Sequence, residues 1–138
     1  PADIVLLKTS VNDNTCYVET KSLDGETNLK IRLVNQDITD IVTTPQAVQT
    51  IQGDMTCEKP NASLYTFTGN LKLNSTTIPL RPEHLILRGM SLKNTESIHG
   101  LIIFAGDDTK LMQNSAPAIY KMSSLEILID NITDHAHF

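Results

Sequence analysis

The four residues Asp24, Gly25, Glu26 and Thr27 have the types and spacing best suited to chemistry in this sequence. They lie between two strand-like runs, where Asp-Gly favours the positive φ angles of a tight β-connection, a common structural feature. Glu26 is expected at the tip of this turn, so its carboxylate can be presented to another surface. A carboxylate there can hold and deprotonate a water molecule if a partner surface excludes bulk solvent. Lys30 can orient the loop by its charge, or it can simply be solvated.

Other kinds of site lack a supporting pattern. The histidines have no cysteine or carboxylate neighbours at a metal-ligand spacing, so we expect no metal site and no bound cofactor. They are His84, His99, His135 and His137. There is no glycine-rich phosphate loop and no Gly-x-Ser-x-Gly motif, which leaves nucleotide binding and serine hydrolysis without support. Cys16 and Cys57 are too few for a disulfide scaffold and favour free thiols in a reducing compartment.

Length and charge limit the possible classes of protein. The chain has 138 residues, the size of one domain, and a formal net charge of −5. Such a surface repels phosphate backbones, so we expect no nucleic-acid partner. No apolar run approaches the ~20 residues of a membrane-spanning helix. Because the sequence starts at Pro1 rather than at a methionine, we expect it to be part of a longer protein.

Short β-like runs separated by turn residues extend along the chain. Thr, Ile and Val supply 36 of the 138 residues, and such β-branched side chains fit a pleated sheet better than a helix. The pattern predicts a mainly β sandwich, roll or barrel. The runs are 3–7, 16–20, 27–34, 55–59, 64–73, 77–80, 85–88 and 98–105.

Two segments depart from the β pattern. Thr44 followed by Pro45 has the form of a helix N-cap, apolar residues follow at helical spacing, and Gly53 stands where that helix would stop. Near the end, Ser123 begins a capping-box pattern with an apolar i, i+3, i+4, i+7 stripe that extends to Ile132. By itself this second pattern predicts an amphipathic helix.

Several sequence blocks, in one order, resemble the type IV P-type ATPases, the phospholipid-transporting flippases of eukaryotic membranes. The resemblance covers nearly the whole chain and is weakest over 35–53 and after Asn131. The blocks are Pro-Ala-Asp-Ile-Val-Leu-Leu (1–7), Cys-Tyr-Val-Glu-Thr (16–20), Leu-Asp-Gly-Glu-Thr-Asn-Leu-Lys (23–30), Cys-Glu-Lys-Pro-Asn (57–61), Leu-Tyr (64–65), Phe-Thr-Gly-Asn (67–70), Leu-Arg-Gly-Met-Ser-Leu-Lys-Asn-Thr (87–95) and Gly-Asp-Asp-Thr-Lys-Leu-Met-Gln-Asn-Ser (106–115). Most other P-type subfamilies carry Thr-Gly-Glu where this chain has Asp24-Gly25-Glu26.

The resemblance implies the cytosolic actuator domain of such a pump. The implied fold is mainly β, a distorted jelly-roll similar to a double-stranded β-helix, with one or two short helices. Residues 1–122 would form the actuator domain, whose N-terminal strands would precede Pro1. Residues 123–138 would lead as a connector towards the third transmembrane helix, which reinterprets the apolar stripe there.

The resemblance also implies a mechanism. Glu26 would position the water that hydrolyses an aspartyl-phosphate intermediate and act as its general base, while Asp24, Gly25 and Thr27 would shape the loop. The partners would be the phosphorylation and nucleotide-binding domains of the same chain, the phospholipid substrate and an accessory subunit of the parent pump. ATP and Mg²⁺ would serve the parent, a multi-pass membrane protein, whereas this segment alone would be inactive.

From the residues alone, a noncatalytic β-rich module that binds another protein remains an alternative. It predicts a standalone gene and a binding surface that tolerates substitution of Glu26. A secreted, glycosylated domain would require sugar on Asn61 or Asn74 and a bond between the two cysteines.

Overall fold

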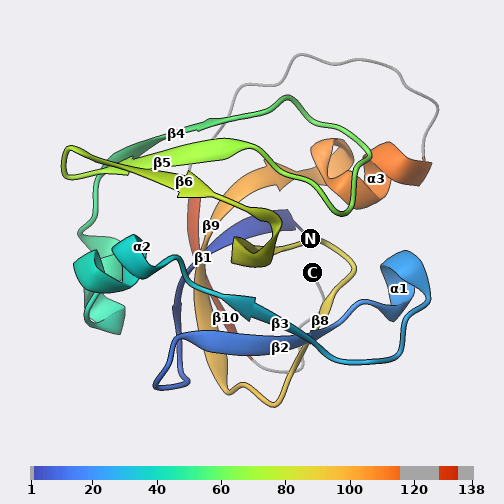
Figure 1. Ribbon diagram of the computed structural model, residues 1–138, viewed down its shortest axis with the longest axis horizontal. Helices are drawn as coiled ribbons and strands as arrows, with labels where there is room; N and C mark the ends of the chain where they lie inside the picture. Colours follow the sequence, from blue (N-terminus) through green and yellow to red (C-terminus); the bar gives the residue numbers. More distant parts are fainter. Residues whose placement is uncertain (1, 116–127, 134–138) are drawn as a thin grey trace.

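The computed structural model describes residues 2–115 and 128–133, and strands predominate in it (Figure 1). The strands are β1 (Ala2–Thr9), β2 (Thr15–Glu19), β3 (Lys30–Leu33), β4 (Gly53–Cys57), β5 (Gly69–Leu73), β6 (Thr76–Leu80), β7 (Leu85–Ile86), β8 (Ser91–Lys93), β9 (Ser97–Ala105) and β10 (Leu128–Thr133). The helices are α1 (Lys21–Asp24), α2 (Gln36–Ile41) and α3 (Lys110–Ser115), with 3-10 turns η1 (Pro45–Gln49), η2 (Pro82–His84) and η3 (Gly106–Asp108). The mainly β prediction is confirmed.

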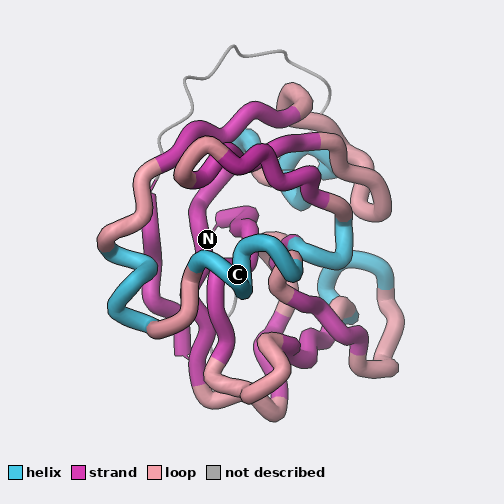
Figure 2. The backbone as a smooth tube through the Cα atoms, turned by 60° about the vertical axis from the view of Figure 1, so that its left-hand side comes forward, coloured by secondary structure: helices cyan, strands magenta, loops and turns pink. Residues whose placement is uncertain are grey.

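The strands form three small antiparallel sheets. Their orders are β10-β9-β1-β7, β3-β2-β8 and β4-β5-β6. Figure 1 shows the β4-β5-β6 sheet at the top and β2 with β3 at the bottom, while β1, β9 and β10 cross between them. Figure 2 shows the same backbone turned, with short helices interrupting the strands and loops.

Strand β1 forms the centre of the core. It pairs with β9 on one side and β7 on the other, and its residues from Asp3 to Leu7 are all buried. A strand covered on both faces reads as a continuous apolar run, which is how Ile-Val-Leu-Leu appears in the sequence. Leu92 of β8 and Ile98 of β9 are also fully buried in the same cluster. The only charged residue in this buried stretch of β1 is Asp3.

The helix predicted from Thr44 is present in a tighter form. The Thr44 hydroxyl accepts a hydrogen bond from Ala47 N–H at 3.2 Å, as the cap pattern indicates, but the segment that follows is the 3-10 turn η1. It ends at Thr50, and Gly53 begins β4 instead of terminating a helix. Within this short segment Val48 is buried in the core.

Two local predictions are wrong. The connection at Asp24-Gly25 has the predicted positive φ at Gly25 but is not a tight β-connection, because Lys21–Asp24 forms the single turn α1 before the chain enters β3. The helix predicted to extend to Ile132 is replaced over Leu128–Thr133 by strand β10, paired with β9 from Leu128↔Ile102 to Thr133↔Ser97. Ladder hydrogen bonds along β9 stabilise that extended backbone, and no local pattern reveals a partner so far away in sequence. Residues 123–127 lie outside the described residues.

Candidate functional site

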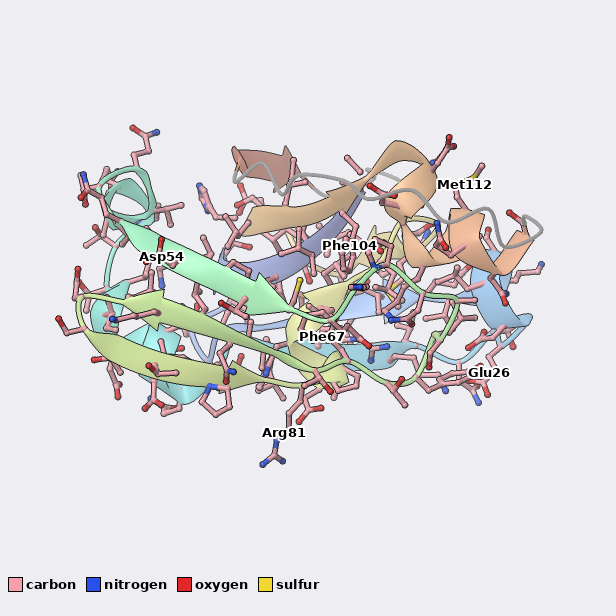
Figure 3. The ribbon with its side chains drawn as sticks, turned by 90° about the horizontal axis from the view of Figure 1, so that it is seen from above. Glu26, Asp54, Phe67, Arg81, Phe104 and Met112 are labelled. Carbon is pink, nitrogen blue, oxygen red and sulfur yellow. The ribbon has the colours of Figure 1, made fainter. Side chains whose placement is uncertain are left out.

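A pocket of about 250 Å³ lies beside the Asp24–Thr27 loop. Three separate segments line it: residues 20–32, residues 64 and 65 of the loop between β4 and β5, and the turn that contains Leu87 and Met90. Figure 3 shows Glu26 at the same end of the molecule as Met112 of α3, with Asp54 of β4 at the opposite end. The predicted catalytic loop therefore lies at one end of the β body.

Asp24 organises the loop through hydrogen bonds on one of its carboxylate oxygens. The Thr20 hydroxyl donates to Asp24 Oδ1 at 2.9 Å, and the Glu26 backbone N–H donates to the same oxygen at 3.0 Å. Partial burial would raise the pKa of Asp24, but hydrogen bonds from Glu26 N–H, Thr20 and Tyr65 outweigh it and lower that pKa. Asp24 therefore stays ionised and fixes the backbone of the residue predicted to be the general base.

Gly25 provides the left-handed residue that ends α1. Its φ is 75°, and its N–H donates to Lys21 O at 2.9 Å, which closes the helical turn. A side chain at this position would meet nothing within 4 Å, so the glycine is needed for its backbone angle alone. The loop-shaping role of Gly25 in the parent pump stays a prediction.

Replacing Gly25 by alanine is expected to lower the free energy of unfolding by about 1 kcal/mol, because a Cβ disfavours the left-handed region. Gly89→Ala is the matched comparison, with an expected cost of roughly 2 kcal/mol. Gly89 combines a φ of 97° with a Cβ position only 3.3 Å from the Leu23 side chain. Chemical unfolding of both variants measures the difference. An equal or larger loss for Gly25→Ala would contradict this assignment.

Glu26 is exposed and forms an ion pair with Lys30, the first residue of β3. The side chains remain 52% and 35% exposed, so solvent reaches both partners. The hydrogen bond to Glu26 raises the pKa of Lys30. Such an exposed pair adds little stability and exchanges easily. Lys30 therefore makes a charge contact with the Glu26 carboxylate, as one of the two expectations for Lys30 predicted, and leaves that carboxylate exposed.

Tyr65 and Arg32 complete the polar lining. Tyr65 lies 41 positions from Asp24 in sequence, yet its hydroxyl donates to Asp24 Oδ2 at 3.4 Å. Arg32 lines the pocket from β3, and among the described residues its buried Nε has no hydrogen-bond partner. Burial lowers the pKa of Arg32. Sequence reasoning assigned neither residue a role, because no local pattern links them to Asp24.

Thr27 is exposed, and within the described ranges its hydroxyl makes no hydrogen bond. The loop-fixing contact expected of Thr27 is thus made instead by Thr20, on the opposite side of Asp24. The role of Thr27 stays a prediction for the complete protein.

The remaining candidate side chains have structural surroundings. His84 is buried, and its Nδ1 accepts the Arg81 N–H at 3.0 Å. Cys16 and Cys57 are both free, and burial raises the pKa of Cys16 to about 12. No group of three His, Cys, Asp or Glu side chains suited to a metal occurs in residues 2–115 and 128–133. His135 and His137 lie outside those ranges. In residues 2–115 and 128–133, no helix is long and apolar enough to cross a membrane.

The fold and the site together define a class of protein: a β-rich domain with an exposed carboxylate loop at one end. No protein-family model matches the chain. Curated relatives do: "Probable phospholipid-transporting ATPase 7" of Arabidopsis thaliana is 44% identical over 96% of this chain and 10% of its own length. "Phospholipid-transporting ATPase 6" of the same plant is 44% identical over 96% of the chain and 11% of its own length. "Phospholipid-transporting ATPase IK" of Mus musculus is 39% identical over 96% and 10%.

These relatives confirm the resemblance. Over nearly its whole length the chain is homologous to phospholipid-transporting ATPases, the type IV P-type ATPases. The chain spans about a tenth of the length of the curated relatives that it matches.

Proposed function

We propose that this chain is the cytosol-facing actuator domain of an ATP-driven phospholipid flippase and that its Asp24–Thr27 loop promotes hydrolysis of the pump's aspartyl-phosphate. The observation that carries the proposal is the exposed Glu26 carboxylate, whose backbone is held by an ionised Asp24 at one end of the β body. The homology to phospholipid-transporting ATPases supports the parent activity.

The chemistry asked of Glu26 is a single proton transfer. A water molecule attacks phosphorus, its new P–O bond forms as the bond to the aspartate oxygen breaks, and the aspartate leaves as a carboxylate. Glu26 accepts the proton that the water loses and later returns it to solvent or to the released phosphate. The phosphorylated aspartate belongs to another domain of the parent. In that domain ATP would supply the phosphoryl group, and Mg²⁺ would neutralise part of its charge.

Docking of the phosphorylation domain would replace the contact between Glu26 and Lys30. The ion pair is open to solvent, so its separation costs little when a dry interface forms around the loop. Rotation of the domain would then couple hydrolysis to movement of the membrane helices and to lipid translocation. Residues 1–122 are proposed as the rotating body and 123–138 as the connector. The accessory subunit of the parent stays a prediction.

Sequencing the parent transcript on both sides of this chain tests its placement. We expect a hydrophobic helix pair upstream, then a further membrane helix and Asp-Lys-Thr-Gly-Thr downstream. A start codon directly before Pro1 and a stop codon directly after Phe138 would instead support the noncatalytic module. The role of the loop itself is tested by the decay of the phosphoenzyme in a Glu26→Gln pump.

A further inference from the structure

A buried lysine begins the helix that follows β9 and η3. Lys110 is only 1% exposed, although it begins α3. Its ammonium Nζ donates to Asn61 Oδ1 at 2.9 Å and lies 3.6 Å from Glu58 Oε1. A buried ammonium is costly unless it is paired and hydrogen-bonded, so these contacts are structurally important.

Both partners of Lys110 belong to the loop 58–68 that joins β4 to β5. Glu58 closes the neck of this loop, because its N–H donates to Thr68 O at 2.9 Å and its Oε1 accepts the Thr68 N–H at 3.2 Å. Asn61 shapes the interior: its Nδ2 donates to Glu58 Oε2 at 2.8 Å, and its Oδ1 accepts the Ser63 N–H at 3.0 Å. Lys110 therefore binds the two side chains that define the loop's conformation.

The same loop supplies one wall of the pocket beside Glu26. Leu64 and Tyr65 line that wall, and the Tyr65 hydroxyl donates to Asp24, which in turn accepts the Glu26 N–H. Tyr65 is 69% exposed, so its own packing cannot hold it there. In Figure 1 the connection from β4 to β5 extends towards the end where α1 and α3 lie.

We infer that Lys110 is a positioning residue for the proposed hydrolysis: it anchors the 58–68 loop so that Tyr65 holds Asp24, and Asp24 holds the backbone of Glu26. The inference rests on the proposed function of Glu26. It adds that Lys110, 84 positions further along the chain, stabilises the loop that positions Glu26. Lys110 touches no reacting atom. Its effect is transmitted through the loop.

The test compares phosphoenzyme decay in the full-length parent pump and in Lys110→Met, Tyr65→Phe and the double variant. Each single variant is expected to form phosphoenzyme normally and to hydrolyse it about three- to tenfold more slowly, the effect of one misplaced hydrogen bond. Because both act through one contact, the double variant is expected to be no slower than Lys110→Met alone. Effects that multiply would overturn the inference, as would unchanged decay in Tyr65→Phe.

Hydrogen exchange provides a readout that does not depend on activity. In Lys110→Met the amides of residues 58–68 are expected to exchange faster, whereas Lys72→Met, which removes an exposed lysine from β5, is expected to leave them unchanged. Unchanged protection in Lys110→Met contradicts the anchoring role. Should Lys110→Met fail to accumulate, Tyr65→Phe decides the question, because an exposed hydroxyl can be removed without loss of the fold.

Glu26→Gln in the same decay assay distinguishes failure of the positioning role from failure of the proposed function. Slow decay in Glu26→Gln with normal decay in Tyr65→Phe and Lys110→Met would reject the positioning role and retain the proposed function. Normal decay in Glu26→Gln would reject the proposed function itself.

Discussion

In the parent pump, Glu26→Gln is expected to leave phosphorylation by ATP intact and to slow phosphoenzyme hydrolysis by about 10²- to 10⁴-fold, the usual contribution of a positioned general base. The amide keeps the size and most of the hydrogen-bonding capacity of the carboxylate but cannot accept a proton at neutral pH. The surrounding loop should be unaffected, because Asp24 holds the Glu26 backbone N–H and not its side chain. Pulse labelling from ATP, followed by a chase, measures the decay directly.

Two companion variants make this result specific. Glu96→Gln removes an exposed carboxylate from the turn before β9 and is expected to decay at the wild-type rate. Lys30→Met removes the partner of Glu26 and is expected to change decay much less than Glu26→Gln, since that contact is open to solvent and separates on docking in our proposal. A Glu26→Gln pump with normal decay would mean that another group activates the water.

The second large effect concerns Asp3, a buried carboxylate on β1. Its Oδ1 accepts the Arg88 N–H and its Oδ2 accepts the Lys110 N–H, each at 2.8 Å. Asp3→Ala leaves one buried donor and one part-buried donor without an acceptor, so near pH 4.5 we expect a loss of about 2–5 kcal/mol in the free energy of unfolding. Asp54→Asn, on the exposed face of β4, is expected to leave that free energy nearly unchanged.

Asp3 also makes stability depend on pH. Burial raises its pKa from the usual 3.8 to about 6, against the hydrogen bonds from Arg88 and Lys110. Between pH 3.8 and about pH 6, the folded state therefore keeps a proton on Asp3 that the unfolded state has already released. The stability that Asp3 contributes is fully present below pH 3.8 and is lost as pH rises through 6, by about 3 kcal/mol in total.

Chemical unfolding of wild type and Asp3→Asn between pH 4 and pH 7 measures this dependence. The neutral amide cannot titrate, so the stability of wild type relative to Asp3→Asn should fall as pH rises. A difference that stayed constant, or that grew with pH, would show that Asp3 remains ionised across this range in the folded protein.

The positions of several strands and of one capped turn could be predicted from the sequence, because these features depend on residues close together in the chain. The β-branched runs correspond to strands at β1, β2, β6 and β9, since alternation and apolar runs report how a strand is covered. Thr44 caps its turn as predicted because capping involves only residues three positions apart. The Asp24–Thr27 motif and its resemblance to the flippases likewise come from residues close together in the chain.

The tertiary structure alone decided how the loop is supported. The contact of Tyr65 with Asp24 spans 41 positions and that of Lys110 with Asp3 spans 107, so no periodicity or motif can reveal either. Leu128–Thr133 shows the same limit: its apolar spacing suits a helix, but pairing with β9 makes it a strand. Sequence patterns record which residues can do chemistry and how their neighbours fold. Which distant groups hold them in place depends on the packing of three sheets, where long-range hydrogen bonds and burial outweigh local preference.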